Sequence, residues 1–180
     1  MKIEKTDIQD CLLIKPKIYK DNRGFFLETF QKERYLNDAK ISLNFVQDNF
    51  SSSSKGVLRG LHFQKNKPQG KFICVLKGEI FDVALDLRKN SKTYLKAFKC
   101  NLSEKNKTSV YIPPGFAHGF YTKGKENLVL YGCTNYRDKN SEGGLLWNDK
   151  DLKIKWPSKK PNLSKKDENN PTLKEFLKNG

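Results

Sequence analysis

The sequence predicts an all-β domain, folded as a sandwich or a barrel, and three observations support this. Short runs of β-branched and aromatic residues recur along the chain between Gly, Pro, Asn and Ser. Helical periodicity is scarce. The 180 residues, 36% hydrophobic and 12% aromatic, are enough for one core. We therefore expect a single domain over residues 1–180, with N-terminal strands to about residue 50, a barrel over about 51–150 and a C-terminal extension over about 151–180.

Strands are expected along most of the chain. The predicted segments are 11–19, 24–30, 44–50, 56–64, 71–76, 79–87, 94–102, 109–114, 118–123 and 127–136. Lys77 and Gly78 stand between two alternating apolar runs, which predicts a hairpin there, because a tight turn needs a residue tolerant of positive φ. In 79–87 the alternation places Asp82, Ala84 and Asp86 on one polar face, which we expect to line a cavity.

Two short helices are predicted, at 31–39 and at the C-terminal PTLKEFLKN, where Pro171 would take a favoured first-turn position. The stretch from Pro157 to Pro171 is rich in Lys, Ser, Asn and Pro. We expect it to form a surface excursion that is anchored at one point.

The charge balance suggests a small anionic ligand. The chain carries 35 Lys and Arg against 20 Asp and Glu, a net charge of +15. The charge is spread along the chain without a helix-turn-helix, zinc-finger or RRM pattern, so we expect no nucleic-acid partner. No apolar run is long enough to cross a bilayer, and we expect no membrane partner and a cytoplasmic location. Four widely spaced cysteines, Cys11, Cys74, Cys100 and Cys133, fit reduced thiols.

The two histidines lie in motifs that resemble those of the cupin superfamily of small β-barrels, GVLRGLHFQ with His62 and IPPGFAHGF with His118. In metal-binding cupins, three His and one Glu hold an ion, and the corresponding positions here are His62, Gln64, Lys71 and His118. A Lys ammonium repels a cation and has no lone pair to donate. We therefore expect no metal, and a pocket suited to an anionic substrate or intermediate.

A longer series of blocks resembles the dTDP-4-dehydrorhamnose 3,5-epimerases, metal-free cupins of rhamnose and hence surface-polysaccharide biosynthesis. The blocks are DNRGFFLETF, VQDNFSSS, GVLRGLHFQ, QGKFICVLKGEIFDVALDLR, IPPGFAHGF, LYGCTNY, GGLLWND, IKWP and LSKKD, from about residue 20 to 170. The resemblance implies a cupin-type jelly-roll β-barrel, or double-stranded β-helix, with short peripheral helices and a C-terminal helix. It also implies cofactor-free conversion of dTDP-4-dehydro-6-deoxy-D-glucose to dTDP-4-dehydro-L-rhamnose by inversion of C3 and C5.

The chemistry needs three groups, because C3 and C5 flank the C4 ketone and their protons leave to form an enolate. These are a base on one face of the sugar, a proton donor on the other and a group that stabilises the enolate oxygen. The resemblance implies that His62 is the base with Asp167 as its partner, that Tyr131 is the acid and that Lys71 lies near the enolate oxygen. Asp82 is expected to pair with Lys71 or His62.

The family resemblance also implies the substrate contacts. The expected diphosphate contacts are Arg23, Arg59 and Lys166, and the contacts to sugar and base are Glu28, Gln47 and Asn49. Phe26 and Tyr136 are expected to sandwich the thymine, with Phe26 coming from the partner of a homodimer. Glu142 and His118 complete the set, and for His118 a sugar contact and a purely structural role both stay open.

One geometric expectation concerns Arg59 and His62. They are an odd number of residues apart, so a regular strand would point them to opposite faces. Both are expected to serve one pocket. The strand should therefore bend or bulge near Gly60.

Other interpretations stay open. One is epimerisation at C3 only, or at C3 and C5 of another nucleotide-activated 4-keto hexose or heptose. A metal-dependent cupin oxygenase is a more distant alternative, which the missing second His and Lys71 oppose. A non-enzymatic polyanion-binding module predicts salt-sensitive binding to nucleic acid. Read alone, Tyr131 could be a core residue and Asp167 an exposed loop residue.

Overall fold

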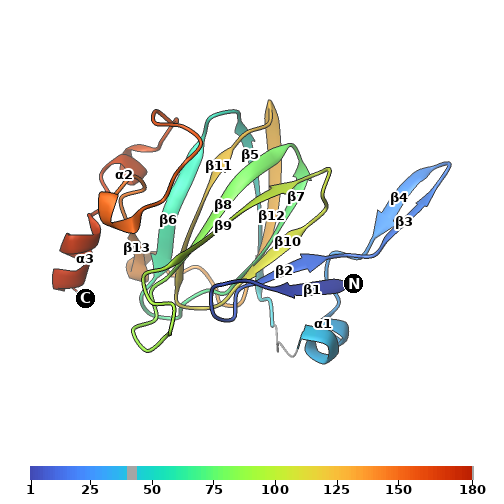
Figure 1. The fold of residues 1–180 in the computed structure, drawn as a ribbon, viewed down its shortest axis with the longest axis horizontal. Helices are drawn as coiled ribbons and strands as arrows, with labels where there is room; N and C mark the ends of the chain where they lie inside the picture. Colours follow the sequence, from blue (N-terminus) through green and yellow to red (C-terminus); the bar gives the residue numbers. More distant parts are fainter. Residues whose placement is uncertain (40–43, 180) are drawn as a thin grey trace.

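The computed structural model describes residues 1–39 and 44–179 as two antiparallel β-sheets packed face to face, with short helices at the periphery (Figure 1). The first sheet has the order β1 (Lys2–Lys5), β2 (Leu12–Lys15), β10 (Ser109–Ile112), β7 (Lys71–Lys77), β12 (Glu126–Cys133), β5 (Gln47–Ser54). The second has the order β13 (Glu142–Gly144), β6 (Leu58–Gln64), β11 (Phe116–Thr122), β8 (Glu79–Asp86), β9 (Ala97–Ser103). The prediction of a mostly β chain is confirmed.

The main core lies between the sheets and explains the alternation in β8. Ile80 and Ala84 pack with Ile73 and Val75 of the opposite sheet. Val83 and Leu85 point the other way and pack in a second apolar cluster with Leu145 and Leu173 from the C-terminal part of the chain. β8 is thus buried on both faces, and Asp82, in phase with Ile80 and Ala84, points into the space between the sheets. The expectation that this face lines a cavity is wrong, because Ala84 packs in the core between the sheets and the Asp86 carboxylate binds Arg88.

The predicted hairpin at Lys77–Gly78 is wrong. β7 pairs with β10 and β12 in the first sheet, whereas β8 pairs with β9 and β11 in the second. The chain therefore turns a corner between the sheets. Gly78 has a φ of +82°, and a Cβ there would lie 2.2 Å from the carbonyl oxygen of Glu126. The glycine is required, as the sequence indicated, but for a corner and not for a two-stranded turn.

Several strand boundaries also differ from the prediction. The expected strand 11–19 is interrupted at Pro16, and β3 (Ile18–Asp21) begins beyond it. The expected strand 44–50 begins at Gln47 and continues through four serines to Ser54, because every residue of β5 pairs with β12. The short strands β1 and β13 were not predicted. Hydrogen-bonded pairing with a neighbouring strand determines where these strands begin and end more than the β-propensity of their own residues does.

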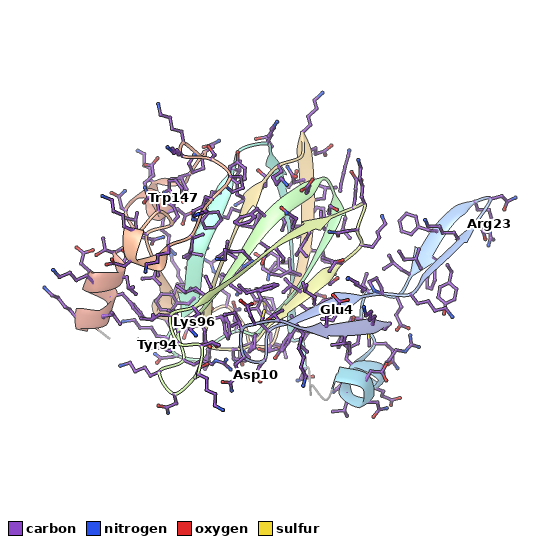
Figure 2. All side chains as sticks on the ribbon, viewed as in Figure 1. Glu4, Asp10, Arg23, Tyr94, Lys96 and Trp147 are labelled. Atoms are coloured by element: carbon purple, nitrogen blue, oxygen red, sulfur yellow. The ribbon has the colours of Figure 1, made fainter. Side chains whose placement is uncertain are left out.

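A two-stranded hairpin of β3 and β4 (Gly24–Leu27) projects from one end of the molecule, with Arg23 near its tip (Figures 1 and 2). The predicted helix at 31–39 is confirmed as α1 (Lys32–Ala39). Its Tyr35 is buried and packs edge-on against Phe72 on the outer face of the first sheet. The helix thus covers part of that face.

The C-terminal part packs against the second sheet at the other end of the molecule (Figure 1). Its helices are η1 (Lys139–Ser141), η2 (Lys150–Leu152), α2 (Lys165–Glu168) and α3 (Leu173–Asn179). Thr172 and Glu175 cap α3 by reciprocal hydrogen bonds, so Pro171 precedes the helix and its predicted first-turn position is wrong. Among the described residues, no helix has the length and apolar character that a membrane span requires.

Candidate active site

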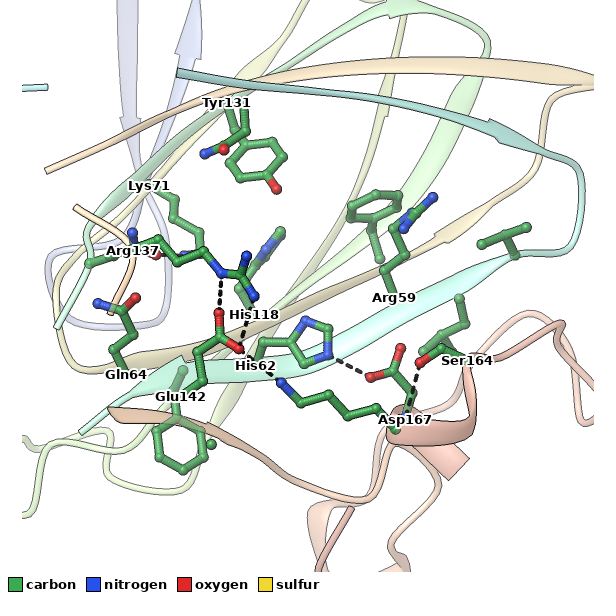
Figure 3. Close-up of a pocket in the computed structure, with 18 of the residues that line it drawn as sticks. Arg59, His62, Gln64, Lys71, His118, Tyr131, Arg137, Glu142, Ser164 and Asp167 are labelled. Atoms are coloured by element: carbon green, nitrogen blue, oxygen red, sulfur yellow. Dashed lines mark hydrogen bonds and ion pairs between the residues drawn. The ribbon is translucent and has the colours of Figure 1, made fainter. Parts of the chain in front are cut away.

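A cavity of about 520 Å³ opens between the two sheets, beside α2 (Figure 3). Predicted site residues that line it are Gln47, Asn49, Arg59, His62, Lys71, His118, Tyr131, Glu142, Lys166 and Asp167. They come from β5, β6, β7, β11, β12, β13 and α2, so the cavity is assembled from segments that are distant in the chain. The structure brings these ten residues together.

His62 and Asp167 form a dyad on one wall. The His62 Nε2 lies 2.5 Å from the Asp167 Oδ1, and Ser164 caps the short helix that carries Asp167. Burial raises the pKa of Asp167, but hydrogen bonds from His62, Ser164 and the Gly60 backbone outweigh it, so its pKa lies below the ordinary value. The ionised carboxylate accepts a hydrogen bond from the Nε2–H of His62. With Nε2 as the donor, the lone pair of the imidazole is on Nδ1. Figure 3 shows that nitrogen turned toward the cavity.

The bulge expected near Gly60 is confirmed. His62 pairs with His118 and Arg59 pairs with Phe120. The two pairs are three residues apart on β6 but only two residues apart on β11, so β6 contains one extra residue. Gly60 has a φ of +128°, and a Cβ there would lie 2.5 Å from the Cα of Gly119. The extra residue lets Arg59 and His62 line the same cavity.

Tyr131 lies on the opposite wall, on β12, and Figure 3 shows its hydroxyl pointing into the cavity. Burial raises the pKa of the phenol, and Cys133 adds to this effect. Arg59 and Arg137 act in the other direction by favouring the phenolate. The phenol is therefore protonated at neutral pH, yet two cations lie close enough to stabilise the anion that remains after it gives up its proton.

Lys71 opens β7 and extends into the cavity, not to the surface. Burial lowers the pKa of its ammonium, against the influence of Cys133 and Glu142, which raise it. The Nζ donates a hydrogen bond to Gln69 Oε1 at 3.0 Å. A cation thus lies between the wall of His62 and the wall of Tyr131 (Figure 3).

His118 forms a second, deeper pair with Asp82. The His118 Nε2 lies 2.8 Å from the Asp82 Oδ2, and both side chains are buried. The expectation that Asp82 pairs with Lys71 or His62 is wrong. β8 and β11 are neighbours, and Asp82 is directly opposite Phe120, two residues from His118, so the His is within reach on the same face.

The four positions that correspond to cupin metal ligands do not form a suitable ligand set. Gln64 donates to the carbonyl oxygens of Lys67 and Tyr136 and accepts from the Asp138 amide, so its side chain holds the neighbouring loops. Lys71 contributes a cation, and both histidines use Nε2 for a carboxylate. A divalent metal would need anionic or neutral donors that converge on one point.

Glu142 binds two cations at the cavity mouth. Its carboxylate contacts Arg137 Nε at 2.5 Å and Lys166 Nζ at 3.0 Å. The bond from Arg137 is the main reason that the pKa of Glu142 falls to about 2, and Lys166 adds to the effect. Sequence reasoning missed Arg137, whose only signal was its place beside the predicted Tyr136. Its backbone amide donates to Gln47, which also bonds Asn49.

Four predicted residues lie outside the cavity of this chain. Arg23 and Phe26 are exposed on the projecting hairpin, where Arg23 bonds Asp21 instead. Glu28 follows the hairpin and pairs with Arg34. Neither Arg23 nor Glu28 lines the cavity of its own chain, and the hairpin that carries Arg23 projects away from the two sheets (Figure 2). Tyr136 is exposed next to Arg137, which lines the cavity, and its carbonyl oxygen accepts a hydrogen bond from Gln64.

Comparisons with known proteins agree on one family. The family model described as dTDP-4-dehydrorhamnose 3,5-epimerase matches residues 5–175. A protein of that name from Shigella flexneri is 46% identical over 170 residues, covering 94% of each chain. The crystal structure of one from Elizabethkingia anophelis superposes with a TM-score of 0.93 at 43% identity, covering 97% of each chain. A dTDP-6-deoxy-D-glucose-3,5-epimerase from Legionella pneumophila, solved in complex with dTDP-4-keto-L-rhamnose, gives 0.93 at 46% identity, covering 96% of this chain and 93% of that one.

Proposed function

Because this chain belongs to the dTDP-4-dehydrorhamnose 3,5-epimerase family, we propose that it inverts C3 and C5 of dTDP-4-dehydro-6-deoxy-D-glucose to give dTDP-4-dehydro-L-rhamnose. The observation that carries this proposal is the arrangement of three groups around one cavity. A His62–Asp167 dyad occupies one wall, a phenol the opposite wall, and Lys71 lies between them. This is the set that enolisation beside a ketone requires.

In the first step, Nδ1 of His62 removes the proton from a carbon next to the ketone. The electron pair of the broken C–H bond moves toward the C4 oxygen, and an enolate forms. Asp167 stabilises the imidazolium, because its depressed pKa keeps it ionised. The pair thereby favours the charged state that follows proton abstraction.

In the second step, Tyr131 gives its proton to the other face of the same carbon, and the configuration inverts. The phenolate that remains lies in the field of Arg59 and Arg137. Lys71 balances the charge on the enolate oxygen in a partly closed site, where such charges interact more strongly than in water. His62 then releases its proton to solvent and Tyr131 takes one up from it, so that the cycle can repeat at the second carbon without a redox cofactor or metal.

The nucleotide is held at the cationic end of the cavity. Arg59 and Lys166 bind the diphosphate, and the planar fork of Arg59 suits this ligand. Gln47 and Asn49 contact the sugar or the base, and Glu142 lies beside them at the mouth. His118 supports the floor of the cavity through Asp82.

The remaining contacts come from a second copy of the chain in a homodimer. Phe26, 67% exposed, and Arg23 belong to the projecting hairpin, and neither lines the cavity of its own chain. On the outer face of the first sheet, Phe50 and Leu76 are exposed beside Leu130 and suit an apolar contact between two copies. The hairpin would then carry Phe26 to Tyr136 of the partner and enclose the base.

We assign the two-sheet architecture to a cupin-type jelly roll and the whole chain to one domain. The corner at Gly78, where the chain crosses between the sheets, supports the first assignment. The shared core between the sheets supports the second. A cytoplasmic location accords with four cysteines that are free thiols in the described residues. We expect neither nucleic acid nor a membrane as partner.

The test is incubation of the purified protein with dTDP-4-dehydro-6-deoxy-D-glucose in deuterated water, followed by NMR. We expect deuterium at C3 and C5 and the appearance of the L-sugar. Exchange at C3 alone would identify a mono-epimerase, and exchange only with another nucleotide sugar would change the substrate. No exchange with any 4-keto sugar nucleotide would contradict the proposal. Metal-dependent turnover would indicate the oxygenase, and salt-sensitive nucleic-acid binding the polyanion module.

A further inference from the structure

Gln69 connects the Lys71 side chain by hydrogen bonds to the backbone of Asn135. Its Oε1 accepts a hydrogen bond from Lys71 Nζ at 3.0 Å, and its Nε2 donates to the carbonyl oxygen of Asn135 at 2.9 Å. Both Gln69 and Lys71 line the cavity. The family resemblance assigned no role to Gln69, and the sequence offered no signal for one.

The segment that carries Gln69 is braced on both sides. Asn135 returns a hydrogen bond from its side-chain amide to the carbonyl oxygen of Pro68 at 2.8 Å. Gly70 and Thr134 exchange two more, at 2.7 Å and 3.0 Å. Backbone and side-chain bonds thus hold residues 68–70 against the end of β12. A side chain on such a braced segment has little freedom to move.

Chemistry fixes which end of the Gln69 amide faces Lys71. The Asn135 carbonyl oxygen can only accept, so it requires the NH₂ end of Gln69. The oxygen end must then face the ammonium. A reversed amide would set two acceptors and two donors against each other, which is unfavourable at both contacts.

A neutral acceptor suits the function of Lys71 better than a carboxylate would. An ammonium paired closely with a carboxylate has much of its field cancelled, whereas an amide oxygen orients it and leaves its net charge. The other titratable groups acting on Lys71 are Cys133 and Glu142, and Glu142 is already engaged by Arg137 and Lys166. The full charge of Lys71 thus remains directed into the cavity.

We propose that Gln69 is a positioning residue that holds the Lys71 ammonium toward the reacting centre through a neutral hydrogen bond, so that the charge of Lys71 acts on the enolate oxygen. The inference rests on the proposed epimerase function. It assigns to Gln69 no contact with the substrate, and its effect is expected on kcat more than on KM.

Two variants test this inference. Gln69→Met removes the acceptor at similar length, and Gln69→Glu keeps an oxygen but adds a negative charge. We expect each to lower kcat roughly 10- to 100-fold with KM changed less than about threefold. Gln9→Met and Gln9→Glu are matched controls, because Gln9 is exposed and lies outside the cavity.

The pH profile of deuterium incorporation separates positioning from mere packing. Loss of the acceptor disfavours the buried ammonium, so in Gln69→Met the pKa of Lys71 falls. The alkaline limb of the profile, where the rate of deuterium incorporation declines as the ammonium loses its proton, therefore moves to lower pH. A carboxylate favours the ammonium, so in Gln69→Glu the limb moves to higher pH. This readout follows the proton abstraction by His62, which does not require the Tyr131 proton.

The outcomes are distinguishable. Absence of incorporation by the wild-type protein would contradict the proposed function itself. The role of Gln69 would be overturned if the wild-type protein is active and the kcat of the variants is unchanged. It would also be overturned if the alkaline limbs of the two variants move in the same direction or do not move. Should Gln69→Met fail to fold, judged by circular dichroism, Gln69→Glu decides alone: a limb at higher pH with reduced kcat supports the inference, and an unchanged limb overturns it.

Discussion

The Nε2 of His62 lies 2.5 Å from the Oδ1 of Asp167, although the two residues are 105 positions apart in the chain. His62 belongs to β6, between β13 and β11 in the second sheet, and Asp167 belongs to a helix of only four residues in a Lys-rich segment. A parallel bridge between Val57 and Asn162 holds that segment beside β6. The C-terminal extension is therefore part of the candidate active site.

The first prediction concerns this dyad. Asp167→Asn should lower kcat by roughly 10²- to 10⁴-fold, because an amide neither fixes the tautomer of His62 nor stabilises its imidazolium. Deuterium exchange measured by NMR should slow at C3 and C5 alike. Asp151→Asn is the control, since Asp151 is exposed on η2. Full exchange rates in Asp167→Asn would argue against the dyad.

The second prediction concerns the opposite wall. Tyr131→Phe should still exchange the proton that His62 removes, but should lose inversion at one or both carbons, because the acid is missing. The NMR spectrum should show deuterium in substrate that keeps its configuration. Tyr121→Phe, on β11 and outside the cavity, should behave as wild type. Normal inversion by Tyr131→Phe would require another proton donor.

The third prediction concerns the dimer. Leu76→Glu on the uncovered sheet face should yield a monomer by light scattering and raise KM, since no partner supplies Phe26. Leu177→Glu is the control, because Leu177 is similarly exposed but lies on α3 at the far end of the molecule. A dimeric Leu76→Glu protein with normal KM would contradict this arrangement.

The fourth prediction tests the same interface by complementation. Phe26→Ala should raise KM roughly 10- to 100-fold through lost base stacking, and His62→Asn should be inactive. In an equal mixture with exchanged subunits, about a quarter of the sites should recover, because half the dimers are mixed and each has one complete site. A mixture that assembles mixed dimers but gains no activity would show that Phe26 serves its own chain.

The fifth prediction concerns acid stability. The pKa of Glu142 is depressed to about 2, so its stabilising effect should be complete above about pH 4.5, the unfolded value, and should be lost as pH falls toward 2. Urea unfolding should show Glu142→Gln less stable than wild type by on the order of 1 kcal/mol at pH 6, with the difference vanishing near pH 2. Glu168→Gln, exposed on α2, is the control. A difference independent of pH would contradict the charge-based cause.

Gly78 shows what the local sequence pattern predicts correctly and what it does not. The sequence indicated a residue with positive φ between two apolar runs, and the structure has one. The pattern predicted that the two apolar segments on either side of Gly78 pair with each other, which is wrong. Alternation indicates which side chains are buried, but it does not indicate which strands are hydrogen-bonded neighbours. The same limit explains β5, whose serines have low strand propensity yet pair along their whole length with β12.

The sequence by itself determined the mostly β fold, the alternation of side chains in β8, the need for a bulge between Arg59 and His62 and most residues of the cavity. These follow from side-chain alternation, from glycine's freedom of φ and from motifs that keep their spacing. Only the tertiary structure decided that Asp82 binds His118, that Arg137 and Gln69 join the site and that the hairpin with Arg23 and Phe26 leaves its own cavity. Those contacts join segments that are far apart in the chain, and their distance in space depends on how the two sheets pack. The local sequence of one segment does not determine that packing.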